Sequence, residues 1–220
     1  MQSATPAVPV HTIFINPKYE NVANYLVAAQ CAMLLLKWSD PERVMDFCVD
    51  EEFLKTFVAE LGNRSPKEGM SEQQASAYTQ TIVQGLVLQL TSTPIQILAA
   101  QWCVDHCPGL REEQRLSMVR EIRELADGLA PQIKLITPPE VFDRNAAMNA
   151  AYTLWWAELV EETQATLPYE TLGYLGKGRE LLDALEGIDT TDKRRYQMAV
   201  DSWAAILDME NWYKWVPHPT

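Results

Sequence analysis

A run of 32 residues without Asp, Glu, Lys, Arg or His is the feature that most constrains this chain. It extends from Gln73 to Val104 and reads QQASAYTQTIVQGLVLQLTSTPIQILAAQWCV, although the whole chain of 220 residues carries 30 acidic and 18 basic side chains. A membrane-spanning helix needs about 20 mostly apolar residues. Glutamines interrupt this run throughout, and the sequence TSTP is expected to divide it. We therefore expect no membrane insertion.

Two helices are predicted within the run. Ser71 and Gln74 have the spacing of a capping box, and Thr93 followed by Pro94 is a second helix-start pattern. Each predicted helix has one broad apolar side, made by Ile82, Val83, Leu86, Val87 and Leu90 in the first and by Ile95, Leu98, Ala99, Trp102 and Cys103 in the second. Burying one large apolar side chain is worth about 1.5–3 kcal/mol. The pair is therefore predicted to form a helical hairpin inside a bundle.

A second set of residues on the first of these helices is polar but neutral. Gln73, Gln80, Gln84 and Thr91 are separated by seven, four and seven positions, which places them on one helical stripe. We call these four residues the neutral stripe. An amide is cheaper to desolvate than a charge, and charged residues are depleted at the centres of interfaces. The stripe therefore predicts either packing against other helices of the same chain or an interface with a partner.

Helix-start and helix-end patterns also occur through the rest of the chain. Helix starts are predicted at Asn16–Pro17, at a Ser39–Glu42 capping box whose helical segment reaches Leu61, at Thr137–Glu140, and at Thr190 or Thr191. The segment from Tyr169 to Glu186 is predicted as a weaker helix, because each of its three glycines costs about 1 kcal/mol relative to alanine. Short extended pieces are expected only at Val10–Ile15 and Gln132–Ile136.

These patterns predict an all-α protein with about nine helices, arranged as a helical bundle or an irregular stack of helical hairpins. Residues 1–15 are expected to be a flexible, proline-containing arm. Residues 16–210 are expected to form a single all-α domain, and residues 211–220 an aromatic and proline-containing tail.

The overall charge argues against some partners. The formal net charge is −12 and the sequence pI is about 4.7, so phosphate backbones are repelled and nucleic-acid binding is not expected. The N-terminal sequence MQSATPAVPV lacks the basic and apolar regions of a signal peptide. We therefore expect a cytoplasmic protein.

One short cluster has the residue types of a zinc site. Cys103, His106 and Cys107 lie within one helical turn, and thiolate and imidazole are common zinc ligands. A structural site needs a fourth ligand, for which only Cys31 or Cys48 remains among the thiols. The alternative is that Cys103 belongs to the apolar side and His106 to the helix end, where a cation is favourable. We predict no metal, no cofactor and no catalytic residues.

The C-terminal sequence MENWYKWVPHPT concentrates aromatic residues at Trp212, Tyr213 and Trp215. Aromatic residues of this density either dock on the core of their own chain or anchor a partner, because they dominate interface hot spots.

Together with the neutral stripe, these residues predict a non-enzymatic protein-interaction module: an adaptor, a chaperone or a structural subunit of a larger assembly. Its partner would be another protein or a second copy. The alternatives are an enzyme with a helical core and no recognisable motif, and an acidic immunity or regulatory protein that binds a basic partner.

Overall fold

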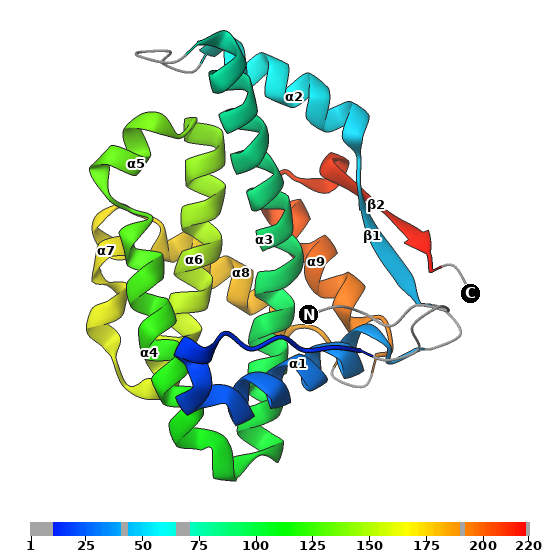
Figure 1. The fold of residues 1–220 in the computed structure, drawn as a ribbon, viewed down its shortest axis with the longest axis vertical. Coiled ribbons are helices and arrows are strands. Elements are labelled where there is room, and N and C mark those ends of the chain that lie inside the picture. Colours follow the sequence, from blue (N-terminus) through cyan, green and yellow to red (C-terminus); the bar gives the residue numbers. More distant parts are fainter. Residues whose placement is uncertain (1–10, 41–43, 65–70, 190–191, 219–220) are drawn as a thin grey trace.

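The computed structural model describes residues 11–40, 44–64, 71–189 and 192–218. Within these ranges the chain forms nine α-helices, four short 3-10 helices and one two-stranded sheet (Figure 1), which confirms the predicted all-α class. The α-helices are α1 (Ala23–Lys37), α2 (Glu51–Arg64), α3 (Glu72–His106), α4 (Arg111–Asp127), α5 (Pro131–Ile136), α6 (Pro139–Val160), α7 (Leu167–Thr171), α8 (Leu175–Glu186) and α9 (Arg195–Ile206). The 3-10 helices are η1 (Pro17–Val22), η2 (Pro108–Leu110), η3 (Thr163–Thr166) and η4 (Glu210–Trp212), and the strands are β1 (Met45–Val49) and β2 (Tyr213–Pro217).

Helix α3 runs along the long axis of the molecule, with α4, α5 and α6 on one side of it and α2, α9 and the sheet on the other (Figure 1). It packs against α1, α2, α6 and α9, and its apolar residues belong to the main core. The predicted capping box is confirmed: Ser71 Oγ accepts from the Gln74 amide at 3.3 Å, and Gln74 Oε1 accepts from the Ser71 amide at 2.9 Å.

The predicted second helix start at Thr93–Pro94 is wrong, because α3 continues through Pro94 to His106. A proline inside a helix removes one backbone donor. In the preceding turn the Thr91 and Ser92 hydroxyls donate to the carbonyls of Leu88 and Gln89, at 2.8 and 3.4 Å. Both halves of α3 are also held in the core, so tertiary packing outweighs the local cost of the proline.

Because α3 is continuous, the argument that TSTP divides the uncharged run does not hold. By length and composition alone, the segment Gln73–His106 would suffice to cross a membrane, since its best 18-residue window has a mean hydropathy of 1.3. Half of that window is buried inside the protein, and core helices of soluble proteins satisfy the same criterion.

Several other helix ends were predicted by local patterns. The Asn16 cap is confirmed, since its side chain accepts from the Lys18 amide at 3.1 Å, and α6 begins next to the predicted Thr137–Pro138 start. The extended piece predicted at Gln132–Ile136 is wrong: it forms α5, whose first residue is a proline that suits a helix start. In the other predicted piece, Val10 lies outside the described residues and residues 11–15 form no strand, apart from one isolated bridge residue.

The segment predicted as one weak helix from Tyr169 to Glu186 is divided into α7 and α8. The break lies at Gly173, whose φ of 83° is in the left-handed region that favours glycine. Gly178, by contrast, is buried where α8 crosses α6, and a Cβ there would lie 2.9 Å from the Cβ of Ala150. The start predicted at Thr190 or Thr191 lies outside the described residues, and α9 begins at Arg195.

The predicted helical segment from Ser39 to Leu61 is wrong over its first half. Glu42 of the expected capping box lies outside the described residues, and the Ser39 hydroxyl donates instead to the carbonyls of Leu36 and Lys193, at 3.1 and 2.5 Å. Met45–Val49 forms β1, which pairs antiparallel with β2 so that Phe47 lies opposite Trp215. The pairing comes from the far end of the chain, so local helix patterns could not reveal it.

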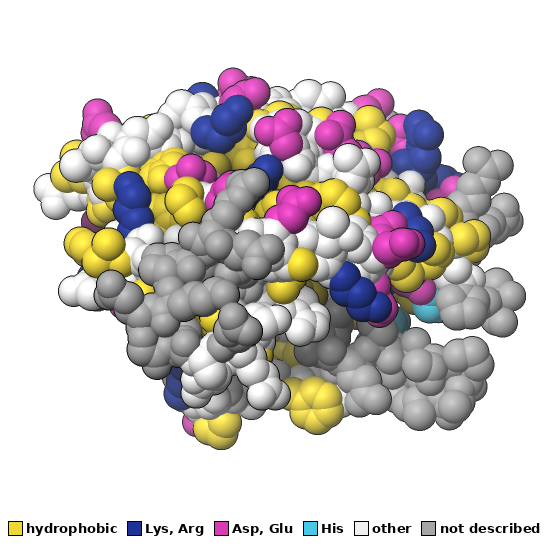
Figure 2. All heavy atoms as spheres, turned by 90° about the horizontal axis from the view of Figure 1, so that it is seen from above, with side chains coloured by type: hydrophobic (Ala, Val, Ile, Leu, Met, Phe, Trp, Pro, Cys, Tyr) yellow, Lys and Arg dark blue, Asp and Glu magenta, His cyan; other side chains and the backbone are white. Residues whose placement is uncertain are grey.

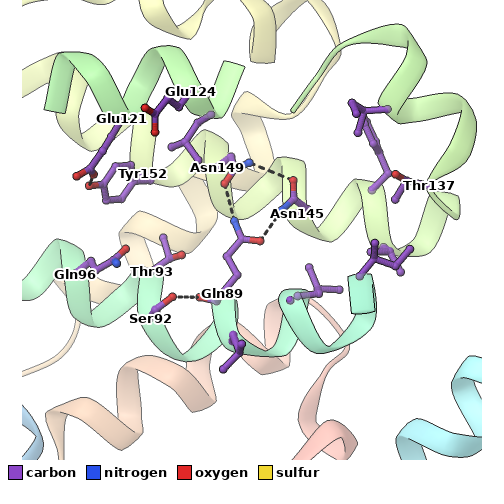
Figure 3. Close-up of a pocket in the computed structure, with 18 of the residues that line it drawn as sticks. Gln89, Ser92, Thr93, Gln96, Glu121, Glu124, Thr137, Asn145, Asn149 and Tyr152 are labelled. Atoms are coloured by element: carbon purple, nitrogen blue, oxygen red, sulfur yellow. Dashed lines mark hydrogen bonds between the residues drawn. The ribbon is translucent and has the colours of Figure 1, made fainter. Parts of the chain in front are cut away.

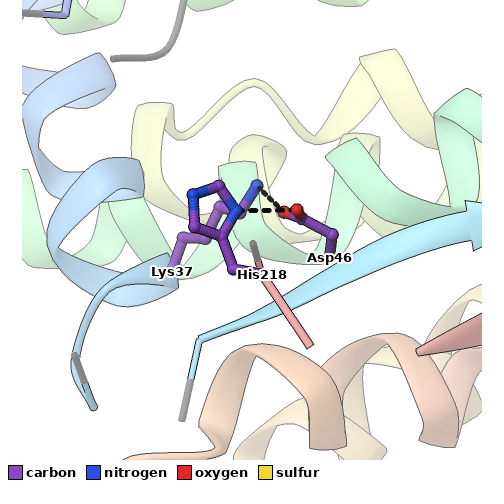
Figure 4. A network of polar contacts seen from close by, with 3 residues as sticks. All are labelled: Lys37, Asp46 and His218. Carbon is purple, nitrogen blue, oxygen red and sulfur yellow. Dashed lines mark hydrogen bonds and ion pairs between the residues drawn. The ribbon is translucent and has the colours of Figure 1, made fainter. Parts of the chain in front are cut away.

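A polar network joins the start of β1 to the C-terminal strand and to α1 (Figure 4). Asp46 pairs through one oxygen with Lys37 Nζ at 3.1 Å and through the other with His218 Nδ1 at 2.7 Å. Partial burial raises the pKa of Asp46, but the hydrogen bonds with His218 and Lys37 outweigh it and lower the pKa below its ordinary value. The network therefore contributes to holding the C-terminal strand β2 beside β1.

Candidate functional site

The neutral stripe lies on the surface of the N-terminal half of α3. Gln73, Gln80 and Gln84 are exposed, and Thr91 is half-buried with its hydroxyl bonded to the chain. Packing against other helices of the same chain therefore does not cover the three glutamines. The interface alternative stays a prediction.

Leu88 continues this stripe, four positions after Gln84, and 67% of it is exposed. It lies between two hollows and lines both of them. We call the exposed face formed by Gln80, Gln84 and Leu88 the α3 ridge. At the ridge, an uncharged part of α3 carries an exposed apolar side chain and lies between two hollows.

The first hollow is the α2–α3 groove, with a volume of about 670 Å³. Its apolar residues include Leu54 and Val58 from α2 and Val83 from α3, while Gln80 and Gln84 lie along its α3 side. Both Leu54 and Val83 are buried, so the groove has a fixed apolar floor.

The second hollow, the polar cavity, has a volume of about 660 Å³ and is lined by residues of α3, α4, α5 and α6. Its centre holds a ring of three amides (Figure 3). Gln89 Nε2 donates to Asn149 Oδ1 at 2.5 Å, Asn149 Nδ2 donates to Asn145 Oδ1 at 3.1 Å, and Asn145 Nδ2 donates to Gln89 Oε1 at 2.7 Å. We call this the amide ring. Each amide has one further N–H and one further lone pair outside the ring, and Asn149 itself is buried.

The local sequence explains how the amide ring forms. Asn145 and Asn149 are four residues apart on α6, so they lie on the same face of the helix. Buried alanines beside them, among them Ala146 and Ala150, leave little side-chain bulk on this part of α6. Gln89 then reaches Asn145 and Asn149 from α3, which packs against α6.

Glu121 on α4 is the principal acid of the polar cavity. Its carboxylate accepts a short hydrogen bond from the Tyr152 hydroxyl and a second from Ser117 Oγ at 3.4 Å. Burial of the carboxyl raises the pKa of Glu121, and the nearby charge of Glu124 raises it further, whereas the two hydrogen bonds act in the opposite direction. Burial, together with Glu121, also raises the pKa of Tyr152 well above its ordinary value.

The walls of this cavity are mostly apolar, and its polar side chains carry amides, hydroxyls and carboxyls. No lysine, arginine or histidine is among the described residues that line the cavity, whereas Glu121 and Glu124 both line it. Lys134 of α5 lies nearby over the ring of Phe142, with its Nζ 5.6 Å from the ring centroid. A carboxyl with a raised pKa can serve as a general acid, so the enzyme alternative would depend on Glu121.

The candidate zinc ligands lie elsewhere, at the C-terminal end of α3. Cys103 is 1% exposed, and burial, followed by the influence of Cys107, raises the pKa of its thiol to about 11. The His106 ring stacks on Trp102 with 4.6 Å between centroids, and its Nδ1 lies 2.9 Å from the Trp102 carbonyl oxygen. In the described part of the chain, no group of three or more His, Cys, Asp or Glu residues is placed to hold a metal ion.

The aromatic residues of the C-terminal segment lie against the fold. Trp212 is 2% exposed and packs on the ring of Phe57 with 4.5 Å between centroids. Tyr213 and Trp215 are half-buried, and both donate to Asp201 Oδ1, at 2.5 and 2.8 Å. A role of these aromatic residues in partner contact stays a prediction.

Sequence reasoning did not identify Glu121, Tyr152 or the amide ring. A usable signal was present, because Asn145 and Asn149 interrupt an otherwise apolar stretch of α6 at helical spacing. The sequence of α4 did not single out Glu121, because α4 carries charged residues on several of its faces.

No protein-family model matches the chain, and no curated protein or solved structure matches it significantly.

Proposed function

We propose that this protein is a non-enzymatic interaction module, acting as an adaptor, chaperone or structural subunit, that holds a basic amphipathic helix of another protein against the α3 ridge. The observation that carries the proposal is Leu88, which is 67% exposed between two hollows on a helix face without charged residues. Single exposed apolar residues are ordinary on protein surfaces. Leu88 differs because an apolar groove and a row of amides lie directly beside it.

The shape of the α2–α3 groove supports a helical partner. Helix-in-groove recognition places apolar anchors spaced three, four or seven residues apart into a hydrophobic groove. The groove offers Leu54, Val58 and Val83 as an apolar floor and the amides of Gln80 and Gln84 as neutral sides. These amides can be covered at a lower desolvation cost than the charged residues found elsewhere on the surface.

The charge of the protein supports a basic partner over a second copy. The chain carries a net charge of −12, so two copies repel each other, whereas a basic segment is attracted. Glu51 lines the α2–α3 groove and Glu124 lines the polar cavity, while Lys55 is the only base lining either hollow among the described residues. Figure 2, which views the molecule from above, shows acidic and basic side chains spread among hydrophobic ones.

The test uses a synthetic amphipathic helix of leucines and lysines, about two heptads long. Its affinity is measured by fluorescence anisotropy for the wild type, for Leu88→Lys and for the control Leu116→Lys, which alters a residue that is 40% exposed on α4. Loss of a central apolar anchor costs about 2 kcal/mol, so Leu88→Lys should weaken binding about 30-fold. The control should leave the affinity unchanged.

Two results would overturn the proposal. One is equal binding of a matched peptide with glutamate in place of lysine, because the charge argument would then fail. The other is a stable homodimer in native mass spectrometry that is lost in the double variant Gln80→Glu and Gln84→Glu, because a second copy would then be the partner of the α3 ridge.

A further inference from the structure

We propose that the polar cavity binds a small organic cation, an ammonium group carried on an apolar body, with Glu121 as its counter-ion and the amide ring as its orienting surface. The site lies on the other side of Leu88 from the α2–α3 groove, and it does not depend on the proposed partner.

The dimensions and walls of the cavity suit a small molecule. Ligand pockets commonly enclose about 300–1,000 Å³ and combine apolar walls with a few convergent polar groups. The volume of this cavity, which is open to solvent on one side, is about 660 Å³ and falls in that range. Leu125, Val141 and Phe142 give it an apolar side, whereas Glu121 and the amide ring give it a polar side (Figure 3).

The charged groups around the cavity select the sign of the ligand. Glu121 is faced by Ser117 and Glu124 on its own helix, by Tyr152 on α6 and by Tyr25 on α1. None of these four groups supplies a positive charge. Glu121 is half-buried, and desolvating its carboxylate without a cationic partner is costly; a bound ammonium group would supply that partner.

Two basic side chains of this region contact aromatic rings and do not line the cavity. Lys134 lies over the Phe142 ring, and Arg120 lies over the Tyr19 ring, where it also donates to the carbonyl oxygen of Lys18 at 3.5 Å. An anionic ligand would therefore meet two carboxyls and no lining base among the described residues.

The amide ring adds directional recognition. Because each of its three amides uses one donor and one acceptor within the ring, the remaining N–H groups and lone pairs can bind a hydroxyl, amide or ether of the ligand. The ring is neutral, so it does not offset the negative charge of Glu121. Glu121 would thus recognise the charge of the ligand, and the amide ring would recognise its neutral polar groups.

The experiment compares three probes of the same shape by isothermal titration calorimetry: 2-phenylethylamine, 2-phenylethanol and phenylacetate. The amine should bind at least about tenfold more tightly than the alcohol, since hydrogen bonds to charged groups are clearly stronger than neutral ones, and phenylacetate should not bind. The affinity for the amine should rise as the pH rises through the pKa of Glu121, which burial raises above its ordinary value, because only the carboxylate form pairs with the ammonium group.

The matched variants are Glu121→Gln, which keeps the shape and one of the two acceptor oxygens, and Glu170→Gln, an exposed position on α7. Glu121→Gln should reduce the affinity for the amine to that for the alcohol and leave the alcohol unaffected, whereas Glu170→Gln should change neither. Equal affinities of the wild type for amine and alcohol, amine binding that survives Glu121→Gln, or no amine binding would each overturn the proposal. The comparison of probes on the wild type decides the matter even if Glu121→Gln does not fold.

Discussion

The crossing of α6 and α8 depends on the absence of a side chain at Gly178. A Cβ at this position would lie 2.9 Å from Ala150 Cβ, 2.9 Å from the Ala151 amide nitrogen and 3.0 Å from the Ala150 carbonyl carbon. Favourable contacts between carbon atoms begin at about 3.5 Å, so the two helices would have to separate by roughly half an ångström or more. Such overpacking costs about 1–3 kcal/mol, and the better helix propensity of alanine returns at most about 1 kcal/mol.

Gly176 provides a matched control in the same helix, because a Cβ there would meet nothing within 4 Å. Gly176→Ala should be neutral or stabilising by up to about 1 kcal/mol, whereas Gly178→Ala should be destabilising by up to about 2 kcal/mol. Urea unfolding monitored by circular dichroism measures both changes in the free energy of unfolding. If Gly178→Ala proves as stable as Gly176→Ala, the reasoning about the close crossing of α6 and α8 is refuted.

Three further perturbations test other parts of the fold. Asp46→Asn should lower the free energy of unfolding at neutral pH by up to about 1 kcal/mol. The pKa of Asp46 is lower in the folded protein than its ordinary value of about 3.9. Its stabilisation is therefore present above that pH and is lost as the pH falls through the folded pKa. A difference between wild type and Asp46→Asn that does not change with pH in urea unfolding would contradict this. The pKa of Glu121 is shifted in the opposite direction, so the wild type should lose stability relative to Glu121→Gln as the pH rises above about 4.3. A stability difference between the two proteins that does not change with pH in the same assay would refute this. Trp212→Ala removes a side chain that is 2% exposed and should cost about 3–5 kcal/mol in thermal or urea unfolding, whereas a loss below about 1 kcal/mol would show that the C-terminal segment is not docked.

Local chemistry made much of the helical framework predictable. The caps at Asn16 and Ser71 are decided by side chains within three residues of the helix start, so the sequence is sufficient to find them. The errors at Pro94 and β1 have a different origin. The continuity of α3 depends on packing along both of its halves, and β1 depends on a strand that lies more than 160 residues further along the chain.

The candidate site was predictable only in part. The lack of charge along the N-terminal half of α3 is a property of the sequence, and it led directly to Gln80 and Gln84. The amide ring required the spatial meeting of Gln89 with Asn145 and Asn149, whose separations of 56 and 60 residues no local pattern encodes. Glu121 became a candidate only when the structure brought it to Tyr152, because burial, and not residue type, gives this carboxyl its raised pKa.

The most direct test of the central claim observes the side chains of the α3 ridge themselves. In a two-dimensional NMR spectrum, the side-chain amide signals of Gln80 and Gln84 should shift or broaden when the leucine–lysine peptide is added. The signal of Gln101, which is exposed near the other end of the same helix and bonded to Asp105 at 3.0 Å, should stay in place. Unchanged signals of Gln80 and Gln84 at saturating peptide, or equal changes at Gln101, would contradict the claim that this uncharged face is where a partner binds.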